Sequence, residues 1–395
     1  MPHERIRHAI PQIKKLAALW PVIGILGPRQ VGKSTLVRNQ LGIDRYCTLD
    51  DEDVLEDIDA SAKVFVSRLQ PPTLIDEVQK APKLFDALKS RVDKKRIPGQ
   101  FYLTGSSGFS SKLGIRESLT GRIGLLRLYP LTLAEQHQKS LQPIPKSPLE
   151  QVAPHRKPRF DIATFSAGLP MGGLPLPCFL RDTAAASLYW ASWLDTTIHR
   201  DLARFFPRGF DPRVPLRILK RLAEASSQGE LFDPVGSLKE FSRRKVLNYL
   251  VAMEEIFLLR RVSIDPRGVG KDHWMTFDSG LLQHLLKDRP SEGTTLSLVR
   301  TFLLNEVLAN SEYSGIRPSL NYFKSARGTP VDWVWDDIPI KIITQSSLKS
   351  IGWQERAVLG AMKKLNSKRG ILLAPIDQPI IEKTGISILP WSVWS

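Results

Sequence analysis

Cysteine is scarce in this sequence of 395 residues, which contains only Cys47 and Cys178. Two isolated cysteines exclude a disulfide framework and a cysteine-based zinc cluster, and they are typical of a reducing cytosol. No apolar run approaches the roughly 18 residues of a membrane-spanning helix. The polar, basic start of the chain also lacks the apolar core of a signal peptide. We therefore expect a cytoplasmic protein with no membrane partner.

Two further absences narrow the possible chemistry. The seven histidines are scattered, with no His-x-x-x-His pair and no Cys/His spacing suited to zinc. No Gly-x-Ser-x-Gly element marks a nucleophilic serine at a strand-to-helix turn. The sequence therefore gives no indication of a zinc site or of an α/β-hydrolase.

Acidic residues are fewer than basic ones, with 40 Asp and Glu against 56 Lys and Arg, so the formal net charge is +16. Such a surplus favours a polyanionic partner, which could be nucleic acid, nucleotide phosphates or an anionic membrane surface. Residues 101–250 carry 21 basic and 12 acidic side chains, whereas residues 251–395 carry 18 and 15. A polyanion contact is therefore expected first in the middle of the chain.

The first 140 residues alternate between strand and helix patterns. Short apolar stretches at 21–27, 72–77 and 100–105 have the character of buried strands, and 35–41 and 84–92 have helical spacing. This alternation predicts an α/β fold with a parallel sheet. Five prolines between 142 and 158 then predict a linker.

A phosphate-binding motif follows the first predicted strand. The segment Gly27-Pro-Arg-Gln-Val-Gly-Lys-Ser34 fits G-x-x-x-x-G-K-[ST] between a strand and a helix. Gly27 and Gly32 permit a backbone whose N–H groups face a phosphate, and the helix dipole adds to the attraction. Lys33 is predicted to reach the β- and γ-phosphates, Ser34 to ligate Mg²⁺, and Thr35 to complete the nucleotide contacts. The alternative is a glycine-rich turn without a ligand.

Polar residues end the next two predicted strands. Asp76 is predicted to hold Mg²⁺, and Glu77 beside it to activate an attacking water, which favours hydrolysis over phosphoryl transfer. The alternative is an acidic helix cap. At the end of the third strand, Thr104 or Ser106 could sense the γ-phosphate, or the segment could be a simple Gly/Ser turn.

Six motifs occur in order along the first third of the chain: Gly27-Pro-Arg-Gln-Val-Gly-Lys-Ser-Thr35, Leu49-Asp-Asp51, Leu74-Ile-Asp-Glu-Val-Gln-Lys-Ala-Pro82, Leu103-Thr-Gly-Ser-Ser107, Leu119-Thr-Gly-Arg122 and Tyr129-Pro-Leu-Thr132. Together they resemble the prokaryotic AAA-type P-loop ATPase family in which the P-loop domain is fused to a C-terminal domain of unknown function. Three later segments are similar to the same family: Gly172-Gly-Leu-Pro175, His199-Arg-Asp201 and Thr276-Phe-Asp-Ser-Gly-Leu281.

This resemblance implies an AAA+-like ATP hydrolase followed by a winged-helix module and a small α/β domain similar to restriction nucleases. It implies that Arg122 acts as a γ-phosphate-sensing or finger arginine, with Arg200 as a second candidate. Either arginine could instead be a surface ion-pair partner. The expected domains are residues 1–140, 141–213, 214–265 and 266–395.

The basic middle of the chain contains a candidate recognition helix. Ser242 is a plausible N-cap, and Arg243, Arg244 and Lys245 open a helix with an apolar face. A winged helix would meet nucleic acid there, with Arg260 and Arg261 on its wing. The alternative is a packing module whose basic residues form a solvated face.

The C-terminal domain departs from the nuclease pattern that the family implies. Glu306 and Asp332 occupy two acidic positions, but Lys341 stands in the position of a glutamate and Ile343 in that of the lysine. A metal ligand and the phosphate-binding lysine are therefore missing. We expect a nuclease-like fold without nuclease activity.

These patterns predict a protein that hydrolyses ATP with Mg²⁺ to drive a conformational switch, with DNA as a possible partner. The alternatives are an ATP-gated DNA-binding regulator with little turnover, a nuclease with an unrecognised site and a P-loop kinase. A homo-oligomer or another protein partner is also compatible with the sequence.

Overall fold

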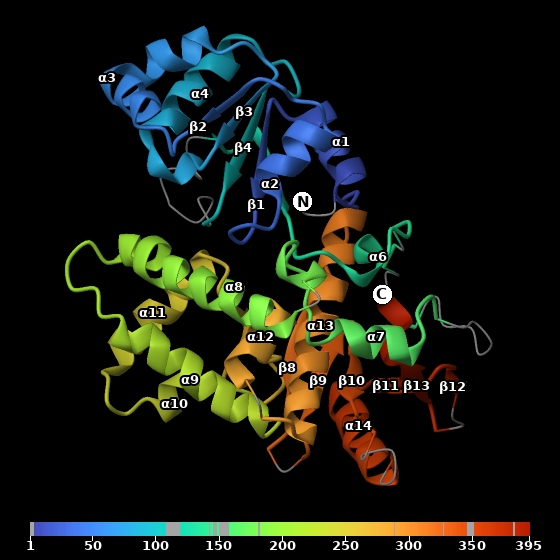
Figure 1. The fold of residues 1–395 in the computed structure, drawn as a ribbon. Coiled ribbons are helices and arrows are strands. Elements are labelled where there is room, and N and C mark those ends of the chain that lie inside the picture. Colours follow the sequence, from blue (N-terminus) through green and yellow to red (C-terminus); the bar gives the residue numbers. More distant parts are fainter. Residues whose placement is uncertain are drawn as a thin grey trace.

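The computed structural model describes most of the chain (Figure 1). The described residues are 4–107, 119–141, 143–144, 148–149, 158–180, 182–287, 289–326, 328–345, 351–381 and 384–395. Across these ranges, no helix has both the length and the apolar character needed to cross a membrane.

The N-terminal domain is built on a five-stranded parallel sheet with the strand order β2-β3-β4-β1-β5. The strands are β1 (Val22–Leu26), β2 (Tyr46–Thr48), β3 (Thr73–Asp76), β4 (Phe101–Gly105) and β5 (Ile123–Arg127). Its helices are α1 (Ile10–Leu19), α2 (Lys33–Thr35), a π-helical turn at Leu36–Gln40, α3 (Glu52–Arg68), a 3-10 turn at Val78–Lys80, and α4 (Lys83–Lys94). The prediction of an α/β domain with a parallel sheet is confirmed.

Alternating side chains of β1, an interior strand between β4 and β5, face the two sides of this sheet. Val22 and Leu26 belong to the core formed with α3 and α4, whereas Ile23 and Ile25 belong to the core formed with α1. All five residues of β1 are buried, which is typical of an interior strand covered on both faces. This burial fixes the carboxyl end of β1 as a rigid base for the loop that follows.

A helical arm follows the first domain. It comprises α6 (Leu133–Gln136), α7 (Ile162–Gly168), a 3-10 turn at Pro177–Phe179, and α8 (Thr183–Thr196) with its continuations Thr197–Leu202 and Ala203–Phe205. In Figure 1, α8 passes below the sheet of the first domain, on the side where β1 ends. The indole of Trp193 stacks on Phe277 at 5.3 Å between ring centroids, which joins α8 to the second half of the chain.

Three helices and a two-stranded ribbon come next: α9 (Arg213–Ser227), α10 (Pro234–Ser237), α11 (Arg243–Glu255), β6 (Leu259–Val262) and β7 (His273–Thr276). Ser242 caps α11 by accepting the N–H of Lys245 at 3.3 Å, as the sequence predicts. The ribbon is completed by β7, which lies beyond the boundary expected at residue 265. Helix α12 (Ser279–Leu286) then packs against α9 and against α13 (Glu292–Ser314).

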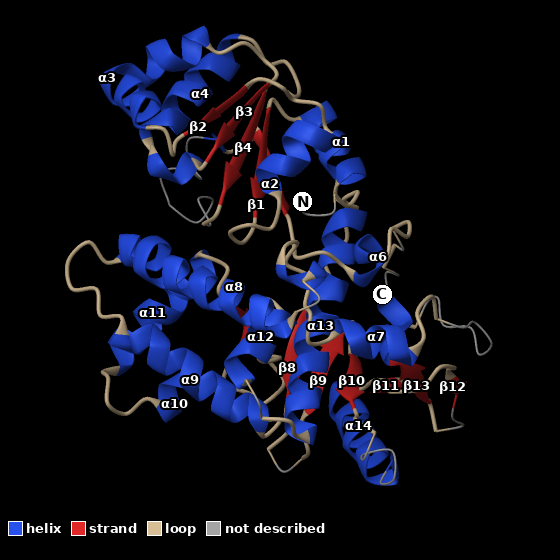
Figure 2. Cartoon of the chain, in the orientation of Figure 1, coloured by secondary structure: helices blue, strands red, loops and turns tan. Residues whose placement is uncertain are grey.

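The C-terminal domain has a mixed six-stranded sheet with the order β12-β13-β11-β10-β9-β8 (Figure 2). Its elements are α13 (Glu292–Ser314), β8 (Leu320–Phe323), β9 (Val331–Trp335), β10 (Ile338–Ile342), α14 (Ile351–Leu365), β11 (Gly370–Ala374), β12 (Ile380–Ile381), β13 (Ile386–Pro390) and a 3-10 turn at Trp391–Trp394. Trp333 of β9 packs in the same core as α13, whereas Val334 packs in the same core as α14. The two helices therefore cover opposite faces.

One buried carboxylate connects the helical arm to α12. Asp278 caps α12 by accepting the N–H of Gly280 at 2.7 Å, and it also accepts the N–H groups of Gly173 at 2.8 Å and Leu174 at 3.2 Å. Burial raises the pKa of Asp278, and these backbone donors oppose the shift. The contact joins Gly172-Gly-Leu-Pro175 to Thr276-Phe-Asp-Ser-Gly-Leu281, two motifs that are about a hundred residues apart.

Candidate nucleotide site

The loop between β1 and α2 has a backbone that only its glycines permit. A Cβ atom on Gly27 would lie 2.3 Å from the carbonyl oxygen of Leu128, and Gly32 has a φ of +94°. The first position is closed to any side chain by contact with the segment after β5, and the second is in the left-handed region that favours glycine. The helix then begins at Lys33, so its free N–H groups point towards the loop, as phosphate binding requires.

Lys33 is buried within this loop. Its ammonium donates to the carbonyl oxygens of Gly27 at 3.0 Å and Pro28 at 2.9 Å. Burial lowers the pKa of Lys33, while the nearby carboxylates Glu77 and Asp76 oppose that change. The cation therefore lies at the phosphate loop with two acidic residues close to it.

Asp76 at the end of β3 meets the hydroxyl of Ser34 across the sheet. Ser34 Oγ donates to Asp76 Oδ2 at 2.6 Å, and the other carboxylate oxygen accepts a hydrogen bond from Thr104. Hydroxyl and carboxylate oxygens are the ligands that Mg²⁺ takes from proteins. Ser34 and Asp76 therefore fit a Mg²⁺ site, and Thr104 orients the carboxylate rather than facing the nucleotide directly.

The backbone of Glu77 is in the left-handed region, and two polar neighbours hold its carboxylate. Its backbone has a φ of 58°, and its carboxylate accepts hydrogen bonds from Ser106 at 3.0 Å and from Gln79. The amide of Gln79 also contacts the Ser106 hydroxyl at 3.2 Å. Ser106 thus contacts the carboxylate of Glu77. Sequence reasoning missed Gln79, because no motif assigns a role to that position.

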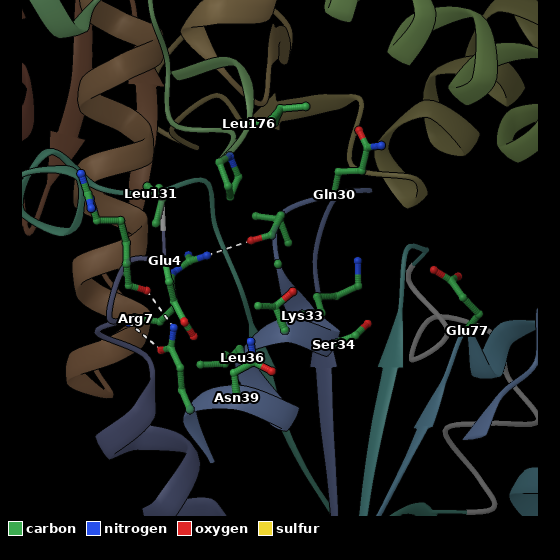
Figure 3. Close-up of a pocket in the computed structure, with 16 residues that line it drawn as sticks. Glu4, Arg7, Gln30, Lys33, Ser34, Leu36, Asn39, Glu77, Leu131 and Leu176 are labelled. Atoms are coloured by element: carbon green, nitrogen blue, oxygen red, sulfur yellow. Dashed lines mark hydrogen bonds between the residues drawn. The ribbon is translucent and has the colours of Figure 1, made fainter. Parts of the chain in front are cut away.

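A cavity of about 500 Å³ opens beside the phosphate loop (Figure 3). One wall is the P-loop and α2, including Thr35, and another is the N-terminal segment 4–7. Leu131 and the pair Pro175 and Leu176 close a further side, and Glu77 lies at the far edge. The cavity has the size and the concave shape of a small-molecule site. The contribution of residues 175–176 could not be found from sequence, because no local pattern brings that segment to the loop.

Arg7 connects this cavity to the C-terminal domain. Its guanidinium donates to the carbonyl oxygen of Val31 in the P-loop at 2.8 Å and to the carboxylate of Glu135 at 3.1 Å. It also contacts the hydroxyl of Tyr313 on α13 at 3.3 Å. Both charged partners are almost fully buried. The P-loop, the helical arm and α13 therefore share one charged contact that sequence reasoning missed.

Arg122 is not at the nucleotide site. It immediately precedes β5, and its carbonyl accepts the N–H of Val22 at the start of β1, whereas the P-loop follows the end of β1. Its guanidinium forms two hydrogen bonds with Asp93, at 2.6 and 2.9 Å. The role of Arg122 as a γ-phosphate-sensing or finger arginine stays a prediction, but within its own chain Arg122 lies at the amino ends of the strands, whereas the P-loop lies at their carboxyl ends.

Arg200 lies closer to the loop but is ion-paired. It contacts Asp50 at 3.1 Å, and the next residue, Asp201, pairs with Arg29 of the P-loop at 3.3 Å. Burial raises the pKa of Asp201, and the arginines oppose this shift. Tyr189 adds a hydrogen bond of 2.6 Å to Gln30. The arm at α8 is therefore attached directly to the P-loop.

The basic start of α11 is partly open to solvent. Arg243 and Arg244 are exposed, and neither has an ion pair within the described ranges. Lys245 instead pairs with Asp211 at 2.8 Å. Hydrogen bonds from Arg213 and from Lys245 lower the pKa of Asp211. Of the three predicted nucleic-acid contacts, Arg243 and Arg244 are exposed with no ion pair among the described residues, and Lys245 is paired with Asp211.

The wing expected at β6 is only partly exposed. Arg261 is exposed, whereas Arg260 lies over the ring of Tyr129 at 5.4 Å and burial lowers its pKa to about 10. Arg260 is half-buried and packs over Tyr129, so only part of its side chain is open on the predicted wing.

The C-terminal domain does not gather the expected acidic residues into a metal site. Asp332 pairs with Arg300 at 2.5 Å and accepts the N–H of Ile342 at 2.7 Å. Glu306 is fully buried and accepts the N–H of Leu133 from the helical arm at 2.9 Å. Among the residues that the structure describes, no group of three His, Cys, Asp or Glu could hold a metal ion.

The remaining two positions of the nuclease pattern carry no metal ligand. Lys341 donates to the carbonyl of Pro330 at 3.1 Å, and burial lowers its pKa. Ile343 is buried in the core beneath α14.

Comparison with known proteins assigns the first domain. Residues 20–137 match the family model described as an AAA domain, and this part of the chain is a P-loop ATPase domain of the AAA type. Two uncharacterised proteins, Rv2008c of Mycobacterium tuberculosis and Mb2031c of Mycobacterium bovis, are each 26% identical over 293 residues, which is 71% of this chain. The chain spans 59% of the length of these curated relatives.

Solved structures show a more distant similarity. The Walker-type ATPase paby2304 of Pyrococcus abyssi aligns with a TM-score of 0.41 and 14% identity, over 70% of this chain and 94% of its own. The ORC1 protein of Aeropyrum pernix, solved in complex with DNA, aligns with a TM-score of 0.30 and 14% identity, over 72% and 93%.

Proposed function

We propose that this chain binds ATP with Mg²⁺ and hydrolyses it, and that hydrolysis drives a conformational change in the domains attached to the ATPase domain. The observation that carries the proposal is the contact between Ser34 and Asp76, 2.6 Å long, beside the P-loop. It brings two Mg²⁺-type oxygen ligands together beside Lys33, with Glu77 next in sequence.

Nucleotide binding follows from the loop. The N–H groups between Gly27 and Ser34 and the start of α2 offer donors and a positive dipole to the phosphates. Lys33 would exchange its two carbonyl partners for phosphate oxygens, which are stronger acceptors because they are charged. Thr35 and the far wall at Leu131 and Leu176 would contact the rest of the nucleotide.

Ser34 and Asp76 would hold Mg²⁺, which neutralises charge on the β- and γ-phosphates when bound. Thr104 keeps one oxygen of Asp76 fixed, so the other remains directed towards Ser34. Glu77 would orient and deprotonate the attacking water. Because Ser106 and Gln79 hold its carboxylate, Glu77 must exchange these partners before it can act on water.

Three contacts would transmit the change. Arg29 of the P-loop pairs with Asp201 of the arm, and Val31 of the same loop accepts from Arg7, which contacts Tyr313 on α13. A movement of the loop on nucleotide binding would therefore act on two other parts of the chain.

Phosphate release tests this proposal. Lys33→Ala should abolish both nucleotide binding and turnover, whereas Glu77→Gln should bind ATP normally and turn over at least about a hundredfold more slowly. Lys63→Ala, an exposed lysine on α3, is the matched control and should behave like the wild type. If Lys33→Ala and Glu77→Gln both leave phosphate release unchanged, the chain does not hydrolyse ATP at this site.

A second candidate function is an ATP-gated DNA-binding regulator with little turnover. The exposed pair Arg243 and Arg244 at the start of α11 supports DNA contact, and the hydrogen bonds that hold Glu77 support slow turnover. In both functions the C-terminal domain acts as a binding or docking domain rather than a nuclease, because Arg300 neutralises Asp332.

A further inference from the structure

Helix α14 presents an exposed face far from the nucleotide site. Its buried side, including Val358 and Met362, packs on the C-terminal sheet. In Figure 1 the helix lies at the end of the molecule away from α3 and α4, and apart from α9–α11. The exposed side of α14 is therefore separate from the nucleotide cavity and from the basic start of α11.

Two apolar side chains are exposed on this face. Trp353 is 55% exposed and Leu359 is 38% exposed. Arg356 lies three residues after Trp353, so the two share one side of the helix. A flat aromatic ring beside cations is the combination that sites for single-stranded nucleic acid use.

Positive charge is concentrated along the same face and just beyond it. The exposed cations are Arg356, Lys363, Lys364, Lys368 and Arg369. Residues 351–369 contain five basic side chains and one acidic side chain, a balance of +4, whereas residues 251–395 as a whole have a balance of +3. The other residues of 251–395 therefore have a balance of −1. The positive charge of this region lies on α14 and just after it.

The helix dipole accounts for only part of this arrangement. Lys363 and Lys364 lie in the last turn, where cations are favourable. Arg356 lies in the middle of the helix, and Lys368 and Arg369 lie beyond its end. None of the five forms an ion pair with any residue that the structure describes.

Two glycines give an independent indication of close approach. Gly352 and Gly360 are exposed, and apart from chain neighbours and the helix's own backbone no described residue lies within 4 Å of a Cβ atom placed on either. Gly360 lies inside the helix, where glycine lowers stability relative to alanine, and no described neighbour requires it there. Glycine is also the residue that lets a ligand approach a backbone closely. The positions flank Arg356 on the same side of the helix.

We propose that the exposed face of α14, formed by Gly352, Trp353, Arg356, Gly360, Lys363 and Lys364, binds single-stranded nucleic acid. The cations track phosphates, and Trp353 provides a flat ring on which an unpaired base stacks. Because the two glycines carry no side chain, the nucleic-acid strand can lie directly against the helix backbone. This inference is independent of ATP hydrolysis and of duplex contact at α11.

A second copy of the chain is the competing occupant. The acidic start of α3 has six exposed carboxylates, at Asp51, Glu52, Asp53, Glu56, Asp57 and Asp59, which would complement the charge of α14. The apolar side chains of that segment, Val54, Leu55 and Ile58, are half-buried or buried. It therefore offers no exposed apolar group for Trp353, whereas a nucleic-acid base does.

The test is fluorescence anisotropy of the full chain with labelled single strands of about 20 nucleotides, one oligothymidylate and one oligouridylate, at several salt concentrations. Lys363→Glu with Lys364→Glu should weaken binding at least about tenfold and reduce the salt dependence. The matched control is Lys94→Glu with Lys95→Glu, two exposed lysines at the end of α4, which changes net charge equally and should keep binding within about twofold.

Two further variants separate stacking from charge. Trp353→Ala should weaken binding about five- to tenfold and Trp353→Phe should restore most of it, because both aromatic rings stack. Gly360→Gln should raise the melting temperature, since glutamine is the better helix former, yet weaken binding by covering the face. A loss of binding in this variant therefore cannot reflect misfolding.

The outcomes decide between occupants. Weaker binding of either single strand by the α14 variants, with the control unaffected, supports the proposal, and the two strands show whether DNA or RNA is preferred. Equal weakening by the control variant overturns it, because net charge alone would then explain the binding. Unchanged anisotropy together with a smaller sedimentation coefficient for Lys363→Glu with Lys364→Glu also overturns it, and identifies a second copy as the occupant.

Discussion

Ser106 donates a hydrogen bond of 3.0 Å to the carboxylate of Glu77, and Gln79 contacts both residues. These hydrogen bonds fix the direction in which the Glu77 carboxylate points. The residue expected to activate water is therefore restrained by its neighbours.

The first prediction concerns this restraint. Gln79→Ala removes one donor without touching the P-loop, so the carboxylate of Glu77 should turn towards an attacking water more easily. We expect kcat for ATP hydrolysis to rise about threefold or more with little change in KM. Steady-state measurements of phosphate release give both kcat and KM. Reduced kcat in Gln79→Ala would show instead that Gln79 positions Glu77 for catalysis.

Arg122 should be dispensable for hydrolysis in a single chain. It lies at the amino ends of the strands, away from the P-loop, and its guanidinium pairs with Asp93. Arg122→Ala should keep kcat within about twofold and change the melting temperature slightly, since exposed ion pairs contribute little. A loss of turnover that appears only as protein concentration rises would place Arg122 at a neighbouring subunit's site.

Arg7 should be important for stability. Removing it leaves Glu135 buried without its ionic partner, which typically costs about 3–5 kcal/mol. Arg7→Ala should therefore lower the free energy of unfolding by that amount in urea titrations. Arg5→Ala, which loses a hydrogen bond to the carbonyl of Gln136, should cost about 1 kcal/mol. Similar losses in both variants would argue against a special role for the buried pair.

Glu306 should make stability depend on pH. Burial raises the pKa of Glu306 to about 8 from an ordinary value of 4.5. The folded state then keeps a proton that the unfolded state has lost, so this residue's contribution is full below pH 4.5 and is lost as pH rises towards 8. Glu306→Gln keeps an acceptor for the N–H of Leu133 and should flatten the decline. Melting temperatures between pH 5 and 9 measure it, and parallel curves for both proteins would refute the assignment.

Duplex DNA binding should depend on α11. Arg243→Ala with Arg244→Ala should weaken binding and reduce the slope of log K against log salt by about two, because two phosphate contacts are lost. Lys245→Ala should have a smaller effect, since Asp211 already engages that lysine. Electrophoretic mobility shifts at several salt concentrations test both. An unaltered salt slope in the double variant would exclude α11 as the contact.

Local spacing is enough to place the elements that carry the candidate site. The loop from Gly27 to Ser34 and the pair Asp76 and Glu77 each follow or end a short apolar strand, as predicted, and the roles of these residues in ATP hydrolysis stay predictions. The helix beginning after Ser242 could be predicted from its cap and its apolar spacing.

The remaining features depend on tertiary packing. Arg7 meets Glu135, and Arg29 meets Asp201, across intervals of 128 and 172 residues, and no local pattern encodes such a pairing. The position of Arg122 also depends on packing, because a motif indicates that an arginine is present but not at which end of the strands it lies. Gln79 was missed because its role depends on the turned backbone of Glu77.

The wall of the nucleotide cavity at Pro175 and Leu176 directly follows Gly173 and Leu174, whose N–H groups are bound by Asp278. The cavity is therefore completed by a segment that is held between α12 and the first domain, since the carbonyl of Gly173 also accepts the N–H of Leu131 at 2.7 Å. A fragment that ends at residue 140 would keep the P-loop, Asp76 and Glu77 but would lose Pro175 and Leu176 from the wall of the cavity. The proposed nucleotide affinity should therefore fall whenever the domains separate.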